Sequence, residues 1–331
     1  TKDMIGDTRK GIKFSGLSGQ ANEGFYYSSY DKPKGSELSA ITDHHKLYFH
    51  KLGTIQTEDK VVFGSDIVRR YVSGTVTEDG RYLVVNASVS TTGNELYIRD
   101  LRKPGNKFTT VVGNFNNDHS VLDNDGSKLY IVTNLNAPDK RVITVDAENP
   151  GVENWVDLIR ETENVIEPEA GSGYIFAHYM IDAISKVKQY DRNGVLVREI
   201  NLPGIGTASG FRAKRADKEV YFSFTNYITP VTIYKLDPKT GNSEIYKKPV
   251  VAFNGYNYES VQIFYNSKDG TRVPMIITCR KGTLLNGKNP TILYGYGGFN
   301  ISETPRFSIP VALWLETGGI YAVANIRGGG E

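Results

Sequence analysis

The stretch EDGRYLVVNAS, Glu78–Ser88, decides the fold because the chain repeats its pattern three more times. Each copy starts with a turn that holds Asp or Gly and continues into a run of Tyr, Val, Ile or Phe, which favour β-strands. The other copies are NDGSKLYIVTN (124–134), AGSGYIFAHYM (170–180) and ADKEVYFSFTN (216–226). Their turn residues lie 46 residues apart each time: Asp79, Asp125, Gly171 and Asp217. Constant spacing over four copies indicates one structural unit that recurs along the chain.

A second predicted strand follows each copy: ELYIRDL, RVITVDAE, KVKQYDRNG and TIYKLDPKTG. Its aspartates are spaced 46, 45 and 46 residues apart: Asp100, Asp146, Asp191 and Asp237. An earlier copy is visible in GFYYSSY (24–30) and KLYFHKLG (46–53), separated by an insertion. A period of about 45 residues made only of short strands and turns is typical of β-propeller blades, which stack because one blade cannot bury both faces alone. We expect a β-propeller over residues 1–250, incomplete at its N-terminus and with about five visible blades; a β-sandwich is the alternative.

The period is lost in residues 251–331, which predict a second domain. Two strands are expected at Val261–Tyr265 and Val273–Thr278, on either side of a Lys-Asp-Gly turn. TILYGY (291–296) is expected to form a third strand, apolar enough to be buried on both faces. GIYAVANIRGGG (319–330) returns to an apolar strand that ends in a Gly-rich loop.

A helix is expected within SETPRFSIPVALWLETGG (302–319). Thr304 is the predicted N-cap, with Pro305 at the first helical position and Gly318 as the C-terminal stop. Pro310 favours the alternative of a turn followed by a shorter helix. An α/β-hydrolase sheet begins with strand, strand, strand, helix and strand, so residues 251–331 are predicted to be the first part of such a domain.

The composition narrows the classes of function. The chain has 331 residues, 39% hydrophobic and 23% charged, which is enough for two globular domains. A net charge of +2 gives no reason to expect nucleic acid or an anionic membrane as a partner. The single cysteine, Cys279, excludes an internal disulfide and a Cys-based zinc site. No apolar run approaches the roughly 20 residues of a membrane helix. We expect no metal and no cofactor; without a visible signal peptide, cytoplasm and periplasm both stay open.

The stretch TILYGYGGFN, Thr291–Asn300, carries the chemistry that the second domain suggests. In α/β-hydrolases, the loop between the third strand and the first helix donates a backbone N–H to the oxyanion hole. Gly297 and Gly298 would let the backbone turn sharply and approach a ligand closely. A donor held there would face the negative oxygen of a tetrahedral intermediate. A loop that only connects a strand to a helix explains the spacing equally well.

These segments together resemble the prolyl oligopeptidase family of serine peptidases. The resemblance covers the whole chain and is closest in VQIFYNSKDGTRVPM (261–275), ILYGYGGFNIS (292–302) and GGIYAVANIRGGGE (318–331). It implies a seven-bladed propeller that limits substrate size, an α/β-hydrolase domain, a monomer, and a Ser-His-Asp triad that cleaves short peptides after proline. The oligopeptidase B branch, which cleaves after basic residues, shares YGYG but usually lacks the following GFN, and stays an alternative.

The resemblance also implies roles for single residues. Tyr296 matches the tyrosine whose hydroxyl helps to form the oxyanion hole, and Phe299 matches the aromatic side chain that lines the proline pocket. Phe14 matches an aromatic residue that the propeller contributes to a more distal substrate subsite. Val72 and Ser90 fall near other propeller positions that face the active-site cavity. Ordinary packing is the competing interpretation for Tyr296, Phe299 and Phe14.

The catalytic triad is not found in the sequence. No G-x-S-x-G elbow occurs, and in the family the nucleophile would follow Glu331, so we expect a fragment of a longer peptidase. A propeller that binds without catalysis is the alternative from another class. Arg327 and Glu331 are expected to form an internal ion pair or to contact the rest of the sheet. The histidines all fall in blades, where we expect surface or loop positions: His44, His45, His50, His119 and His178.

Overall fold

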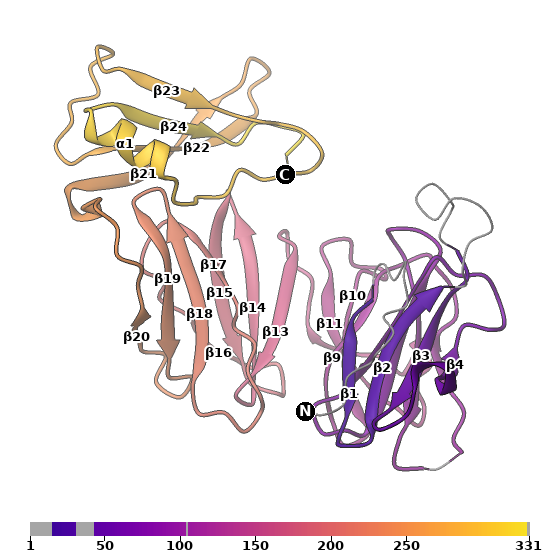
Figure 1. Cartoon of the computed structure of the whole chain (residues 1–331). Helices are drawn as coiled ribbons and strands as arrows, with labels where there is room; N and C mark the ends of the chain where they lie inside the picture. The colour runs from indigo at the N-terminus through magenta and orange to yellow at the C-terminus, as the bar shows by residue number, and fades with distance from the viewer. Residues whose placement is uncertain (1–14, 31–42, 104, 330–331) are drawn as a thin grey trace. The chain divides into compact units, whose positions relative to one another are not determined.

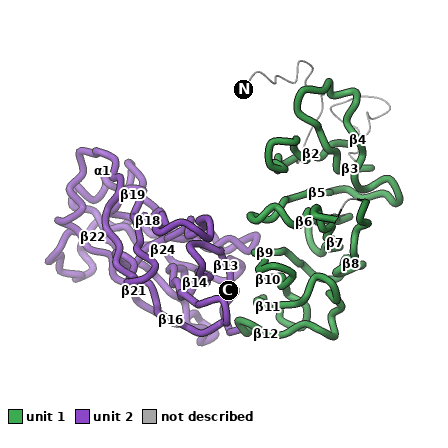
Figure 2. Tube along the Cα trace, turned by 90° about the horizontal axis from the view of Figure 1, so that it is seen from below, with its two compact units in different colours: residues 1–161 green, residues 162–331 purple. Residues whose placement is uncertain are grey.

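The computed structural model describes residues 15–30, 43–103 and 105–329. The chain forms two compact units, Thr1–Glu161 and Thr162–Glu331 (Figure 2). The domain boundary expected at residue 250 falls inside the second unit and stays a prediction. Within the described ranges, no helix combines the length and the apolar character that a membrane crossing requires.

The first unit contains three antiparallel sheets of four strands, and strands that are consecutive in sequence pair with each other (Figure 1). The first sheet holds β1 (Leu17–Gln20), β2 (Gly24–Tyr30), β3 (His45–Lys51) and β4 (Lys60–Phe63). The second holds β5 (Tyr71–Val76), β6 (Tyr82–Ser88), β7 (Glu95–Asp100) and β8 (Thr109–Val112). The third holds β9 (His119–Asp125), β10 (Lys128–Thr133), β11 (Arg141–Asp146) and β12 (Val156–Ile159). Short 3-10 turns precede the outer strands β4 and β12: η1 (Gln56–Glu58) and η2 (Val152–Asn154).

The second unit begins with two more sheets of the same topology. One holds β13 (Ile166–Gly171), β14 (Tyr174–Ile181), β15 (Ile184–Tyr190) and β16 (Leu196–Glu199). The other holds β17 (Thr207–Ser209), β18 (Val220–Asn226), β19 (Thr229–Leu236) and β20 (Ser243–Lys247). Five sheets of one topology in the described chain match the five copies that the repeat predicted.

The repeated aspartates explain why the period is so regular. Each lies at the end of the third strand of its blade or directly after it, and each accepts a hydrogen bond from the backbone N–H two residues further on. The Oδ1–N distances are 2.9, 2.8, 2.8 and 2.8 Å for Asp100, Asp146, Asp191 and Asp237. An aspartate that bonds its own backbone in this way starts a tight turn. The same turn therefore leads from the third strand toward the fourth in four blades.

Neighbouring blades bury their apolar faces against each other, as the repeat requires. In the first unit, Leu96 and Ile98 of β7 share one core with Leu129 and Ile131 of β10. In the second unit, Phe176 of β14 belongs to the same core as residues of β18 and β19. All of these side chains are at most 2% exposed. Since no single four-stranded sheet supplies such a core alone, the blades are stable only as a stack.

A mixed sheet of order β21-β22-β24-β23 follows the short turn η3 (Gly255–Asn257). Its strands are β21 (Tyr258–Asn266), β22 (Arg272–Arg280), β23 (Thr291–Tyr294) and β24 (Ile320–Ala324), with α1 (Ile309–Glu316) between the last two in sequence. β23 pairs in parallel with β24, and the other neighbours are antiparallel. The predicted order of three strands, a helix and a strand is confirmed, and Figure 1 shows α1 beside β24.

Two details of the prediction for this domain were wrong. β23 is not buried on both faces: all four of its residues are exposed, since it lies at an edge of the sheet and pairs only with β24 among the described strands. The helix begins at Ile309, with Ser308 as its N-cap, and not after Thr304. Pro310 lies in its first turn, where a missing N–H costs little. The alternative of a turn followed by a shorter helix is therefore the correct one.

The prediction for the histidines was also wrong for three of the five. His45, His50 and His119 are at most 4% exposed. Each is buried with a specific partner: His45 Nδ1 accepts from the Val72 N–H at 2.9 Å, and His50 Nδ1 lies 2.7 Å from Asp59 Oδ1. Each also packs against an aromatic ring, those of Tyr30, Phe25 and Trp155 respectively, and is therefore part of the interior of its blade.

Candidate active site

The loop after β23 has an unusual backbone. Gly297, Phe299 and Asn300 have φ values of +63°, +54° and +57°. Glycine adopts this left-handed region easily, but a non-glycine residue pays for it. Two consecutive non-glycine residues in this conformation persist only where the surroundings hold them. The loop is therefore built for a particular shape and is more than a flexible connection.

A second loop, residues 325–329 after β24, supplies those surroundings. The Asn300 N–H donates to the Gly328 carbonyl oxygen at 3.1 Å. A Cβ atom on Gly297 would lie 2.6 Å from Ile326 Cγ1 and 2.7 Å from the Arg327 carbonyl oxygen. A Cβ atom on Gly328, whose φ is +88°, would lie 2.6 Å from the Gly297 carbonyl oxygen. Both loops thus need a glycine at the point where their backbones touch.

The interlocked loops present two aromatic side chains to solvent. Tyr296 is 46% exposed and Phe299 is 89% exposed. Within the described ranges, no hydrogen bond is recorded for the Tyr296 hydroxyl, so it is available as a donor. Within the described residues, the Phe299 ring therefore makes little contact with the rest of the protein. The roles of Tyr296 and Phe299 in catalysis and binding stay predictions.

Arg327 of the second loop forms an ion pair at the protein surface. Its Nη1 atom lies 2.5 Å from Asp269 Oδ2, which confirms the expected internal ion pair. Hydrogen bonds from the Ser267 hydroxyl and from Thr271, together with Arg327, hold the pKa of the Asp269 carboxyl well below its usual range. This pair links the β21–β22 turn to the second loop. Glu331, the other residue for which we expected such a contact, lies outside the described residues.

The propeller residues of the predicted site have three different outcomes. Val72 is 2% exposed in β5 and packs in the core with Leu47 and Leu83, and its place near the active-site cavity stays a prediction. Ser90 is exposed just beyond β6, and its carbonyl oxygen accepts from the Ser88 hydroxyl at 3.1 Å. Phe14 lies outside the described residues. Val72 and Ser90 belong to the first unit, and Tyr296 and Phe299 to the second.

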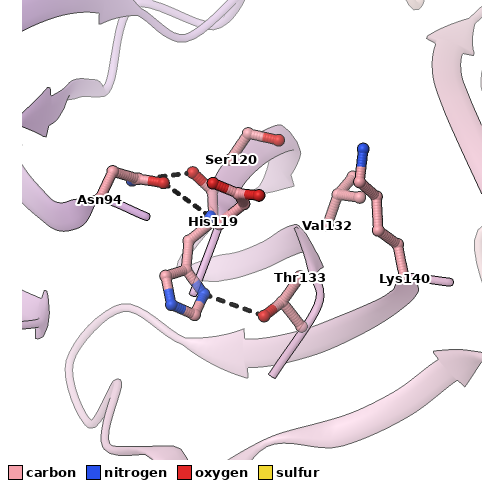
Figure 3. A pocket seen from close by; sticks show the side chains of 7 residues that line it. Asn94, His119, Ser120, Val132, Thr133 and Lys140 are labelled. Carbon is pink, nitrogen blue, oxygen red and sulfur yellow. Dashed lines mark hydrogen bonds between the residues drawn. The ribbon is translucent and has the colours of Figure 1, made fainter. Parts of the chain in front are cut away.

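A cavity of about 100 Å³ in the first unit also gathers polar side chains (Figure 3). Its walls include Asn94, His119, Thr133 and Lys140. The Asn94 side chain accepts from the His119 N–H at 2.8 Å and donates to the His119 carbonyl oxygen at 3.0 Å. His119 Nδ1 is 2.9 Å from the Thr133 hydroxyl. These hydrogen bonds join the β6–β7 loop to β9 and β10, so Asn94, His119 and Thr133 serve as a structural joint between two blades.

No group of three or more His, Cys, Asp or Glu side chains in the described chain could hold a metal ion. Three residues that support the candidate loops were not predicted from the sequence: Thr207, Thr225 and Asn325. Asn325 could have been suspected, because it is the polar residue that directly follows the apolar strand β24. The two threonines carry no such signal, since they occur inside blade repeats.

A family model of the prolyl oligopeptidase N-terminal β-propeller domain matches residues 1–249. The chain belongs to the prolyl oligopeptidase family of serine peptidases. Prolyl endopeptidases of Elizabethkingia meningoseptica and Dictyostelium discoideum are 55% and 32% identical to it, over 100% and 98% of the chain. Each alignment covers 47% of the relative, so the chain spans about half the length of the curated relatives it matches.

Solved structures of the family confirm the β-propeller fold with the start of a catalytic domain. The apo form of prolyl oligopeptidase B from Galerina marginata has a TM-score of 0.85 and 30% identity, over 96% of this chain and 46% of that protein. A form of the same enzyme bound to a 25mer macrocyclization substrate has a TM-score of 0.80 and 31% identity, over 97% and 46%. The interlocked loops lie after residue 249, where the match to the propeller family model ends.

Proposed function

We propose that the protein to which this chain belongs is a serine endopeptidase that hydrolyses short peptides on the carboxyl side of proline. The loop of residues 295–300 carries the proposal: within the described residues the Tyr296 hydroxyl makes no hydrogen bond, and the Phe299 ring is exposed on a backbone in the left-handed region. The 55% identity to a prolyl endopeptidase over the whole chain supports the choice of substrate. The enzyme would act as a monomer without metal or cofactor.

In this mechanism, a serine activated by histidine attacks the carbonyl carbon of the proline residue, the amine of the next residue leaves, and negative charge develops on the proline carbonyl oxygen in the intermediate. The Tyr296 hydroxyl donates a hydrogen bond to that oxygen. A phenol that makes no competing hydrogen bond can do this at little cost of reorganisation. Phe299 offers its flat apolar face to the proline ring. The proposal requires the serine, histidine and aspartate to be contributed from outside this chain.

The propeller would restrict the substrates to short peptides by covering the site. The G. marginata enzyme with its 25mer is a relative that holds a peptide of such a length. Hydrolysis of a proline-containing peptide, compared with the same sequence inside a folded protein, tests this part. Equal rates for both substrates would contradict it.

Replacement of Tyr296 by phenylalanine in the full protein tests the oxyanion role. We expect kcat for a proline-containing peptide to fall roughly 10²- to 10³-fold, which is the usual effect of removing one oxyanion-hole donor, with little change in KM. Tyr294→Phe is the matched control, because Tyr294 lies two residues earlier at the end of β23. Turnover that is unchanged in Tyr296→Phe would exclude this role. Cleavage after arginine in preference to proline would instead favour the oligopeptidase B type of specificity.

A further inference from the structure

Residues 301–308, between the candidate loop and α1, form a strap held by the last blade of the propeller. The Thr207 hydroxyl donates to the Pro305 carbonyl oxygen at 2.7 Å. The Phe307 N–H donates to the Thr225 hydroxyl oxygen at 3.2 Å. Thr207 and Thr225 are directly opposite each other in the β17–β18 pair. One cross-strand pair of threonines therefore bonds to two points of the strap backbone.

The other end of the strap is held by the second loop. Asn325 Oδ1 accepts from the Glu303 N–H at 2.8 Å, and its Nδ2 donates to the Glu303 carbonyl oxygen at 3.3 Å. The Asn325 backbone N–H donates to the Pro274 carbonyl oxygen at 3.0 Å, so Asn325 also connects the strap to β22. The Ser302 hydroxyl donates to the Gly329 carbonyl oxygen at 3.3 Å. Bonds to side chains and to the second loop thus fix a segment that has no regular secondary structure.

An apolar contact beside the strap keeps the blade and the mixed sheet together. Tyr227, just after β18, is 4% exposed and packs edge-on against Tyr321 of β24, with ring centroids 5.5 Å apart. It shares a core with Ile276 and Val323. Burial raises the pKa of the Tyr227 hydroxyl far above its usual value, so this contact stays uncharged across the pH range of peptidase assays. The blade that carries the threonine pair is therefore packed directly against the mixed sheet.

We propose that Thr207 and Thr225 are positioning residues for the candidate active-site loop. They hold the strap at Pro305 and Phe307, Asn325 holds it at Glu303, and the strap continues without a break into Asn300 and the aromatic residues before it. Release of the strap from the blade would loosen the bond from the Asn300 N–H to the second loop. The propeller thereby helps to set the place of the Tyr296 hydroxyl. This inference rests on the proposed function.

Thr207→Val is the cleanest test, because valine keeps the shape and removes only the hydroxyl. Thr225→Val also loses the bond from Thr225 to the Thr229 carbonyl oxygen and serves as a second variant. Ser209 and Ser223 provide the matched control: they are the other hydroxyl pair of β17–β18, 2.9 Å apart, and no bond to the strap is recorded for them in the described residues. Thr207→Ser restores the donor and should restore the behaviour.

Two measurements on the full protein are needed. The first is amide hydrogen exchange of the segments 303–308 and 295–300 without substrate. The second is kcat and KM for a proline-containing peptide. In Thr207→Val we expect faster exchange in both segments and a roughly tenfold lower kcat, less than the ~10²-fold that a 1 Å misplacement can cost. Ser209→Ala and Thr207→Ser should resemble the unaltered protein in both respects.

The outcomes separate this inference from the proposed function. Faster exchange confined to 303–308, with 295–300 unchanged, would overturn the positioning role. A kcat for Thr207→Ser as low as that for Thr207→Val would do the same, since the hydroxyl would then be irrelevant. If the unaltered protein cleaves no proline-containing peptide but both segments exchange faster in Thr207→Val, the proposed function fails and the mechanical coupling stands.

Discussion

At the scale of single residues, the candidate site depends on where a side chain is missing. Gly297 and Gly328 face each other's backbones, and neither position has room for a Cβ atom. Phe299 and Asn300 carry side chains in the same left-handed region and are held there by the contact that the glycines permit. Because Gly297 and Gly328 have no Cβ atom, the two loops can touch, and this contact holds the backbone that carries Tyr296 and Phe299.

Replacement of Gly297 by alanine should disturb the site more than the fold. The new methyl group would meet Ile326 and the Arg327 carbonyl oxygen, and alanine at a φ of +63° adds strain of order 1–2 kcal/mol. We expect kcat/KM of the full protein to fall at least tenfold, with a loss of a few degrees at most in Tm. Gly298→Ala is the control, because its Cβ atom would only touch the Tyr296 ring at 3.6 Å. A similar loss in both variants would show that the contact with Ile326 is not the cause.

Much of the site at this scale could be predicted from the sequence. Tyr296 and Phe299 stand in a Gly-rich stretch directly after an apolar run, and that pattern marks a loop at the end of a strand. Val72 shows the limit of such reasoning. The face on which its side chain lies depends on how neighbouring blades stack, and the local sequence around Val72 does not specify that stacking.

At the scale of elements, the blade turns depend on their aspartates. Asp191 Oδ1 accepts from two backbone N–H groups, those of Asn193 at 2.8 Å and Val195 at 2.9 Å. This pairing closes the hairpin between β15 and β16. The carboxylate works as a local template for the turn, which is why an aspartate recurs there in sequence.

Asp191→Ala should lower the free energy of unfolding by roughly 1–3 kcal/mol, because two backbone donors lose a charged acceptor. Asp191→Asn keeps an acceptor oxygen at the same place and should lose clearly less. Urea denaturation monitored by circular dichroism measures both values. Equal losses for alanine and asparagine would mean that the hydrogen bonds do not stabilise the turn.

The strands were easier to predict than the helix, for a physical reason. A blade strand is specified by local signals, an aspartate turn and a run of β-formers, and these recur four times. The segment 301–308 contains residues that are compatible with a helix start, yet its donors and acceptors bind Thr207, Thr225 and Asn325 instead. These partners are far away in sequence. The exposure of β23 could likewise not be predicted from its apolar sequence, because it follows from the position of β23 at the edge of the described sheet.

At the scale of the whole molecule, buried histidines tie stability to pH. Burial lowers the pKa of both His45 and His119 from 6.5 to about 4. Each is therefore neutral in the folded protein where the unfolded chain already binds a proton. Their contribution to stability is complete above pH 6.5 and is lost progressively as the pH falls toward 4.

The free energy of unfolding should accordingly decrease between pH 6.5 and pH 4, by roughly 1–3 kcal/mol for each of the two histidines. Denaturant unfolding at a series of pH values measures the slope. His45→Asn keeps an acceptor for the Val72 N–H and removes the titrating ring, so its slope should be shallower. His44→Gln is the control, since the His44 side chain is 52% exposed. An unchanged slope in His45→Asn would contradict the assignment.

The order of β21-β22-β24-β23 in the last sheet has a consequence for synthesis on the ribosome. In every blade, each strand meets its partner as soon as the next strand has been made. β23 is different, because its described partner β24 comes after a further helix and must enter between β22 and β23. Until β24 has been made, the backbone N–H and C=O groups of Ile292 and Leu293 have no strand partner in the described sheet, and another chain can pair with them. We therefore expect slower translation of residues 295–319 to lower the yield of folded protein, which expression with slower codons in that segment would measure.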